Sequence, residues 1–151
     1  MNTLKSMKIY CLIWLFPLFL NCSSRVSESS LLKSLERFEY ATNIINKNKN
    51  KLSFQNSSDS LVLIIPELKS EIDFFKKTFG LQKVEVNSTK GGGNFCAAYY
   101  FEDEGESETR LIYSEDSKNL NEYMQFEQFA DCATTKKIKE NWAYSKQRNC
   151  N

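Results

Sequence analysis

Apolar residues recur at helical spacing in two segments of the chain. In residues 29–47 the apolar positions are Leu31, Leu32, Leu35, Phe38, Ala41, Ile44 and Ile45. In the second segment, which begins at Pro66 and ends at Gly80, they are Leu68, Ile72, Phe75 and Phe79. A proline at the start and a glycine just after the last turn are typical helix boundaries. We therefore predict two amphipathic helices, with Phe75 at the centre of the buried face of the second.

Residues 61–65, Leu-Val-Leu-Ile-Ile, are open to two interpretations. They form a continuous apolar run that ends at Pro66, and a proline disfavours helical geometry at the residue before it, which favours a buried strand. The alternative is one longer helix from Asp59, since Leu61 and Ile65 continue the helical spacing. A proline inside that helix would cost about 3 kcal/mol, so we predict the strand.

Beyond Gly80 the pattern changes to the alternation expected of strands. Three segments rich in Val, Tyr and Phe fit strands, namely residues 82–87, 94–102 and 108–114, with turns at 91–93 and 103–107. A helix fits residues 119–129, a last strand fits 141–147, and a loop fits the Asn-, Lys- and Ser-rich residues 46–60. The prediction is an α+β fold, an antiparallel sheet of about four strands packed against one or two helices.

The first residues of the chain are typical of an export signal. Lys5 and Lys8 precede residues 9–20, an apolar stretch without charge. A membrane-spanning helix needs roughly 20 apolar residues to cross about 30 Å of hydrocarbon, so this shorter stretch indicates a removable signal peptide.

Phe19-Leu20-Asn21-Cys22, directly after the apolar stretch, resembles the lipobox of bacterial lipoproteins, in the loose form of spirochaete lipoproteins. The resemblance implies that the Cys22 thiol is alkylated by diacylglycerol, that the signal is cut just before Cys22, and that the new N-terminus is acylated, as with palmitate. The alternative is an ordinary secretory signal, with Cys22 in a disulfide.

The expected organisation is a lipoprotein signal peptide in residues 1–21, a flexible Ser-rich tether in residues 22–30 and a single α+β domain in residues 31–151. Acyl chains gain about 0.8 kcal/mol per buried methylene and would anchor the domain without a membrane-spanning helix. We expect the protein in the bacterial cell envelope, lipid-anchored to the outer rather than the inner membrane.

Composition narrows the chemistry. Lys and Arg (20) nearly balance Asp and Glu (19), so there is no basic excess for binding nucleic acid. The chain contains no histidine, which removes His-dependent nucleophiles, imidazole general bases and His metal ligands. We predict no catalytic residues, no metal site and no cofactor.

Three cysteines remain if Cys11 leaves with the signal and Cys22 is lipidated. The compartment permits disulfides, and Cys132 with Cys150 is the pairing we predict, worth roughly 3 kcal/mol in the chain-entropy model. The two pairings through Cys96 remain alternatives. Because apolar residues flank Cys96, we expect it to be a small buried side chain rather than a reactive thiol.

Residues 66–81 resemble the helix signature of the vicinal oxygen chelate superfamily, which includes glyoxalases, through Pro66-Glu67-Leu68, Phe74-Phe75-Lys76-Lys77 and Phe79-Gly80-Leu81. The resemblance implies that residues 60–115 form half of such a domain, with metal ligands near Ser60 and Glu115. Because the first ligand in that family is a histidine, the metal chemistry does not carry over. Phe79-Gly80-Leu81 before an aromatic hairpin is also similar to small envelope lipoproteins of the outer-membrane assembly type.

Other chemical candidates have simpler interpretations. The acidic residues around Gly105 fit a solvated hairpin tip, and most of the aromatic residues Phe95, Tyr99, Phe101, Tyr113, Trp142 and Tyr144 fit a core. We therefore predict a non-catalytic binding module for a protein partner or surface ligand. The alternative is a small-molecule binder or enzyme on a glyoxalase-like half-unit. A polar pocket near Glu115 would favour the small-molecule binder or enzyme. A sheet face filled by side chains would favour the binding module.

Overall fold

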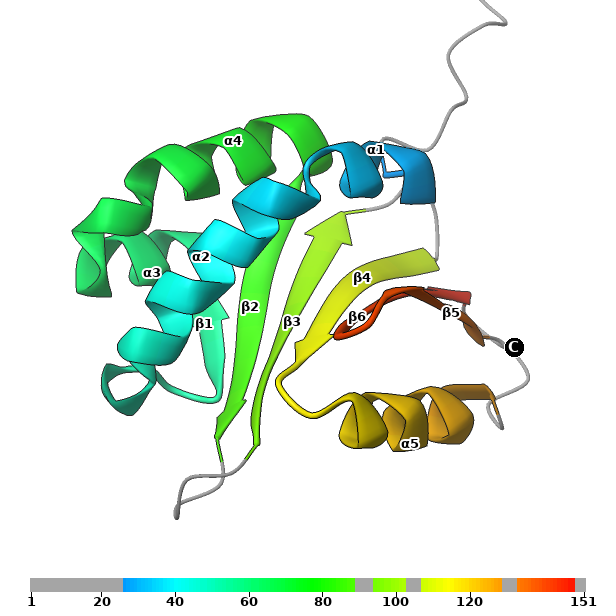
Figure 1. Ribbon diagram of the computed structural model, residues 1–151. Helices are drawn as coiled ribbons and strands as arrows, with labels where there is room; N and C mark the ends of the chain where they lie inside the picture. Colours follow the sequence, from blue (N-terminus) through cyan, green and yellow to red (C-terminus); the bar gives the residue numbers. More distant parts are fainter. Residues whose placement is uncertain (1–25, 89–93, 103–106, 129–132, 149–151) are drawn as a thin grey trace, which may run out of the picture.

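The computed structural model describes residues 26–88, 94–102, 107–128 and 133–148, which form a six-stranded sheet with helices on both faces (Figure 1). The strands are β1 (Gln55–Ser57), β2 (Leu81–Ser88), β3 (Phe95–Glu102), β4 (Ser107–Ser114), β5 (Ala133–Lys139) and β6 (Trp142–Arg148). Their order is β1-β2-β3-β4-β6-β5, and all neighbours are antiparallel. The α+β fold with an antiparallel sheet is confirmed. The sheet has six strands, close to the predicted number of about four, and the difference is β1 and β5, which were not predicted. Five α-helices among the described residues take the place of the one or two that were expected.

Four helices cover one face of the sheet, α1 (Glu28–Lys33), α2 (Leu35–Lys47), α3 (Ser58–Ile64) and α4 (Lys69–Phe79). Two short 3-10 turns, η2 (Lys49–Lys51) and η3 (Pro66–Leu68), follow α2 and precede α4. The helix α5 (Ser117–Gln128) packs on the opposite face, where its Leu120 lies in a small cluster with Ile112 of β4 and Ala143 of β6. None of the helices in the described ranges has the length and apolar character that crossing a membrane requires.

The predicted first helix is divided at Ser34 into α1 and α2. Ser27 caps the start of α1, since Ser30 N–H donates to Ser27 Oγ at 3.2 Å and Ser27 N–H donates to Ser30 Oγ at 3.1 Å. Val26 is fully buried in the core. The predicted tether of residues 22–30 is therefore wrong from Val26 onward, and residues 22–25 lie outside the described residues.

Residues 61–65 were predicted to be a strand, and this is wrong. They belong mostly to α3, which Ser57 caps by accepting a hydrogen bond from Ser60 N–H at 3.1 Å. Leu61 is buried, whereas Leu63 is 82% exposed, so the apolar run lies across a helix surface. The longer helix is also wrong, because Ile65 before Pro66 has φ −130° and ψ 80° and separates α3 from α4.

The aromatic core lies between α2, α4 and the sheet. Phe38 of α2 stacks on Phe75 of α4 with ring centroids 4.0 Å apart, and the Phe38 ring meets Tyr99 edge-on at 5.2 Å. Phe38, Phe75 and Tyr99 are all fully buried. The expectation that Phe75 lies at the centre of a buried helix face is confirmed, and Phe95, Phe101 and Trp142 are buried in the same core.

Gly80 ends α4 in the left-handed region, with φ 68° and ψ 41°. A Cβ atom placed there would lie 3.2 Å from the Cβ of Glu102. Left-handed geometry costs a non-glycine residue roughly 1–2 kcal/mol, so Gly80→Ala should lower the free energy of unfolding by about that amount. Urea denaturation measures the loss, and Thr78→Ala at an exposed position of α4 is the control. Equal stability of the two variants would contradict this account of the turn.

Candidate functional site

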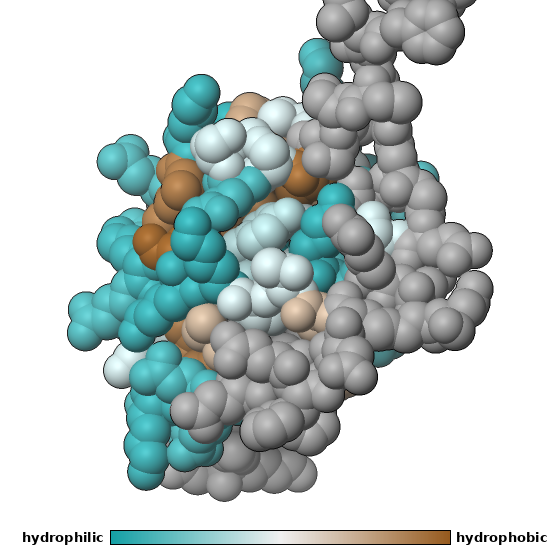
Figure 2. Space-filling view, turned by 90° about the vertical axis from the view of Figure 1, so that its right-hand side faces the viewer, coloured by the Kyte–Doolittle hydropathy of each residue, from teal (hydrophilic) through white to brown (hydrophobic). Residues whose placement is uncertain are grey.

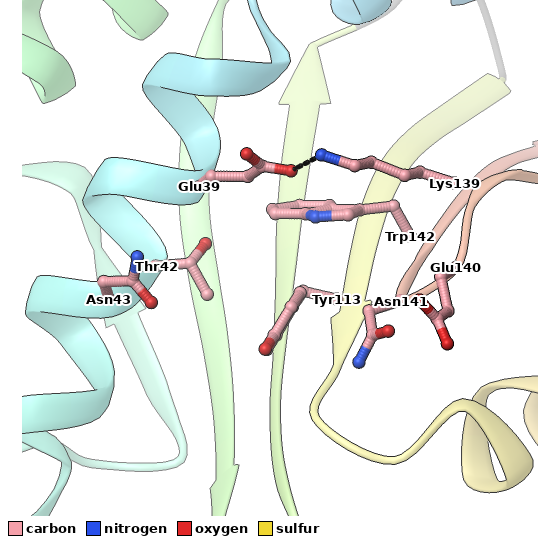
Figure 3. Close-up of a pocket in the computed structure, with 8 residues that line it drawn as sticks. All are labelled: Glu39, Thr42, Asn43, Tyr113, Lys139, Glu140, Asn141 and Trp142. Carbon is pink, nitrogen blue, oxygen red and sulfur yellow. Dashed lines mark hydrogen bonds and ion pairs between the residues drawn. The ribbon is translucent and has the colours of Figure 1, made fainter.

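Two cavities lie on opposite faces of the sheet. The first, here named the hairpin cavity, lies between α2 and the β5–β6 hairpin and has a volume of about 360 Å³ (Figure 3). Its lining residues are Glu39, Thr42, Asn43, Tyr113, Lys139, Glu140, Asn141 and Trp142. The second, the sheet-face cavity, lies beside α5 and also has a volume of about 360 Å³.

Three elements build the hairpin cavity. Glu39, Thr42 and Asn43 are three and four residues apart on α2, so they share one face of that helix. Tyr113 of β4 and Trp142 of β6 are register partners in the sheet and project from neighbouring strands. The turn between β5 and β6 adds polar side chains at the rim.

Trp142 presents a free donor to the hairpin cavity. Its side chain is only 2% exposed, and its ring lies 5.0 Å from the ring of Tyr113 and 6.5 Å from that of Tyr99. No described atom accepts a hydrogen bond from Trp142 Nε1, whereas every fully buried side-chain nitrogen or oxygen among the described residues has a partner. The Nε1–H is therefore accessible from the cavity that the indole lines (Figure 3).

Tyr113 supplies a second free donor. It is half-buried, and its hydroxyl makes no hydrogen bond to any described residue. Burial raises the pKa of Tyr113 above its usual value, and the negative charges of Glu115 and Glu39 raise this pKa further, as does Cys96. The hydroxyl therefore keeps its proton at neutral pH and can donate to a ligand.

The wall behind these donors is fixed by buried hydrogen bonding. Thr42 is 2% exposed, and its hydroxyl lies 2.7 Å from the hydroxyl of Tyr99 in the core. Burial raises the pKa of Tyr99 far above its usual range, so this pair stays neutral. Because both side chains are held in place, the α2 side of the cavity is preorganised.

Charged and amide groups surround the mouth of the cavity. Lys139 forms an ion pair with Glu39, which joins the hairpin to α2 (Figure 3). Asn141 Nδ2 donates to the backbone oxygens of Ser114 at 2.7 Å and Glu115 at 3.0 Å, so the turn is held against β4. Glu140 is exposed and has no partner among the described residues.

The residues aligned with the chelate ligands lie elsewhere. Ser60 is in the first turn of α3, where its hydroxyl donates to Ser57 O at 2.9 Å. The Glu115 carboxylate accepts from Phe95 N–H at 3.4 Å, and Glu115 lines neither cavity. Within the described ranges, no group of three or more His, Cys, Asp or Glu side chains could hold a metal ion. The strand that the chelate resemblance needs at residues 61–65 is helical.

Of the cysteines for which a role was predicted, the structure describes Cys96. Cys22, Cys132 and Cys150 lie outside the described residues. Cys96 is free and half-buried, and its Sγ donates to Ser114 Oγ at 3.4 Å. It lines the sheet-face cavity, on the face opposite the aromatic core, so the expectation of a buried position is wrong. The alternation of β3 explains this, because Phe95 and Ala97 are the residues that point into the core.

The sheet-face cavity has an apolar floor and one ordered polar edge. Ala98, Ile112 and Leu120 contribute apolar surface, and Phe54 at its border is 58% exposed. At the edge, the Glu85 carboxylate accepts hydrogen bonds from the Tyr100 hydroxyl, from Lys83 Nζ at 2.9 Å and from Gln55 Nε2 at 2.9 Å.

Burial alone would raise the pKa of Glu85. The hydrogen bonds from Tyr100 and Lys83, the charge of Lys83 and the hydrogen bond from Gln55 outweigh burial, and the pKa is lowered below 4.5. A lowered pKa in the folded state stabilises the fold above the unfolded-state pKa, and this stabilisation is lost as the pH falls through the folded-state pKa.

Glu85→Gln should therefore reduce the free energy of unfolding by about 1 kcal/mol near neutral pH, and this difference from the unmutated chain should shrink at about pH 3. Urea denaturation at both pH values measures the difference. Glu36→Gln, an exposed position on α2, is the control and should show no such pH dependence. A constant difference for Glu85→Gln would contradict the assigned network.

Sequence patterns did not identify the hairpin cavity. Tyr113 and Trp142 were assigned to the core from their residue type. The indication that was missed is Thr42, a polar residue on the apolar face of α2.

Comparisons with protein-family models, curated proteins and solved structures found no match to this chain.

Proposed function

We propose that this chain is a bacterial cell-envelope lipoprotein, anchored by a lipid on Cys22, whose domain binds a small ligand in the hairpin cavity without catalysing a reaction. The anchor is supported by the apolar stretch and by Phe19-Leu20-Asn21-Cys22 after it. Three residues lie between Cys22 and the buried Val26, so the two are at most about 14 Å apart along the chain. A lipid on Cys22 would therefore hold the domain close to the membrane surface.

The main observation in favour of binding is that Trp142 and Tyr113 both line the hairpin cavity, and that neither Trp142 Nε1–H nor the Tyr113 hydroxyl has a described partner. A polar group removed from water without a hydrogen bond costs about 1–3 kcal/mol, so donors at the wall of a cavity are satisfied best by water or by a ligand. Two such donors in one preorganised cavity are typical of a binding site, where a few polar groups fix the ligand's orientation.

The two acidic residues of the hairpin cavity, Glu39 and Glu140, lie at its rim. Glu39 is in an ion pair with Lys139, and Glu140 is exposed. A carboxyl group that acts as a general acid or base must lie within hydrogen-bond reach of the reacting atom and have a pKa near the working pH. We therefore assign both acids to ligand selection.

Docking of a protein partner is the second candidate, and the sheet-face cavity favours it. On the face that α1–α4 cover, most of the described sheet is packed against the aromatic core, whereas the α5 face has only a small apolar cluster. Phe54 is 58% exposed there, above an apolar floor. On the side of the molecule that Figure 2 shows, the described residues are mostly hydrophilic and the apolar ones form small patches. We favour the small ligand because of the two free donors.

The proposal is tested in detergent with the protein expressed from a Trp14→Phe gene, so that Trp142 is the only tryptophan in both the precursor and the mature chain. The indole Nε1–H then gives one resonance in a ¹⁵N-labelled sample. We expect members of a library of small polar molecules to shift this resonance in a saturable way. A library that leaves the resonance unchanged in folded protein would contradict ligand binding in the hairpin cavity.

A further inference from the structure

The hairpin cavity requires a ligand atom that accepts hydrogen bonds. Trp142 Nε1 can only donate, and it has no acceptor among the described residues. The hydroxyl of Tyr113, on the neighbouring strand, also has no acceptor among the described residues and is free to donate. An ammonium ion has no lone pair, so a cation alone would leave both donors without a partner.

The charge around the cavity disfavours an anion. Glu39 and Glu140 line the cavity, and Lys139, the only cation among the lining residues, is already paired with Glu39. A carboxylate or phosphate bound in the cavity would lie among these two carboxylates without a free cation on the lining to offset its charge.

The rim of the cavity also offers acceptors to the donors of a ligand. Both hydrogens of Asn141 Nδ2 are used by the backbone oxygens of Ser114 and Glu115, so only its Oδ1 remains for a ligand. The Glu140 carboxylate can only accept. A hydroxyl group both donates and accepts, so neighbouring hydroxyls can serve both kinds of wall.

The indole of Trp142 offers the cavity its edge and no open face. Trp142 is only 2% exposed because its ring packs against Tyr113 and Tyr99. A flat aromatic ligand would therefore find no indole face to stack on. We infer that the ligand of the hairpin cavity is an uncharged, hydroxyl-rich molecule, a neutral saccharide, held by the Trp142 and Tyr113 donors; this inference rests on the proposed function.

The test is a titration of the same Trp14→Phe chain with three monosaccharides of matched ring size, namely glucose, glucosamine and glucuronate, together with N-acetylglucosamine as a second neutral sugar. We expect saturable shifts of the Trp142 Nε1–H resonance by a neutral sugar, and binding at least about fivefold weaker for the cationic and anionic sugars. Such a difference corresponds to about one hydrogen bond.

Tyr113→Phe removes one donor and should weaken binding of the neutral sugar about fivefold. Tyr40→Phe, at a 55% exposed position of the same helix as Glu39, is the matched control and should change nothing. Equal or tighter binding of a charged sugar would overturn the inference. So would library members that shift Trp142 while no neutral sugar does, and this result would leave the proposed function standing. If nothing shifts Trp142, the proposed function fails as well.

Discussion

Phe75→Ala is expected to lower the free energy of unfolding by about 3–5 kcal/mol. Phe75 is fully buried, stacks on Phe38 at 4.0 Å and meets Tyr99 edge-on at 6.1 Å. Alanine would therefore leave a cavity where α2, α4 and the sheet meet. The loss is a large part of the roughly 5–15 kcal/mol that stabilises a small domain.

Urea denaturation of Phe75→Ala is compared with that of Phe54→Ala, which truncates a 58% exposed phenylalanine and should cost much less. If Phe75→Ala does not fold, Phe75→Leu supplies a milder variant, with an expected loss of about 1–2 kcal/mol. Equal losses for Phe75→Ala and Phe54→Ala would contradict the packing described for the core.

Cys22→Ala is expected to abolish lipid attachment completely. The lipobox resemblance makes the Cys22 thiol the only point of diacylglycerol attachment and makes cleavage before Cys22 depend on it. The variant should therefore accumulate as an uncut precursor that incorporates no fatty-acid analogue in metabolic labelling.

Cys11→Ala, within the apolar stretch, and Cys96→Ser, in β3, are matched controls that keep the lipobox intact. Both should be labelled like the unmutated chain. Labelling of Cys22→Ala at the level of these controls would show that the lipid, if any, is attached elsewhere.

Sequence patterns predicted the elements whose apolar positions follow one period. Gly80 was correctly expected to end a helix, and the central strands β2, β3 and β4 lie where Val, Tyr and Phe alternate with other residues. The strand β5 was missed because Lys136 and Lys137 interrupt any apolar alternation. Edge strands carry such charges to discourage pairing with other chains, so their sequences resemble loops.

At residues 61–65 a strand was predicted where the chain is mostly helical. A short apolar run does not distinguish a strand from a helix, and Pro66 is compatible with either when the helix ends before it. The Ser57 cap determines the result, and its hydrogen bond to Ser60 N–H could have been anticipated from the serine-rich stretch before Leu61.

The hairpin cavity could not be predicted because its walls are distant in sequence. Glu39 and Lys139, which pair across its mouth, are 100 residues apart. Residue type indicated that Trp142 would be buried, and it is. The orientation of its Nε1–H toward the cavity depends on the packing of Tyr113 and Tyr99, which only the folded structure supplies.

The most direct test of the lipoprotein assignment is the mass of the N-terminal peptide of the mature protein, purified from membranes of a bacterial host. The account predicts a peptide that begins at Cys22 and carries diacylglycerol on its thiol. An unmodified N-terminal peptide, or one that begins at another residue, would contradict it.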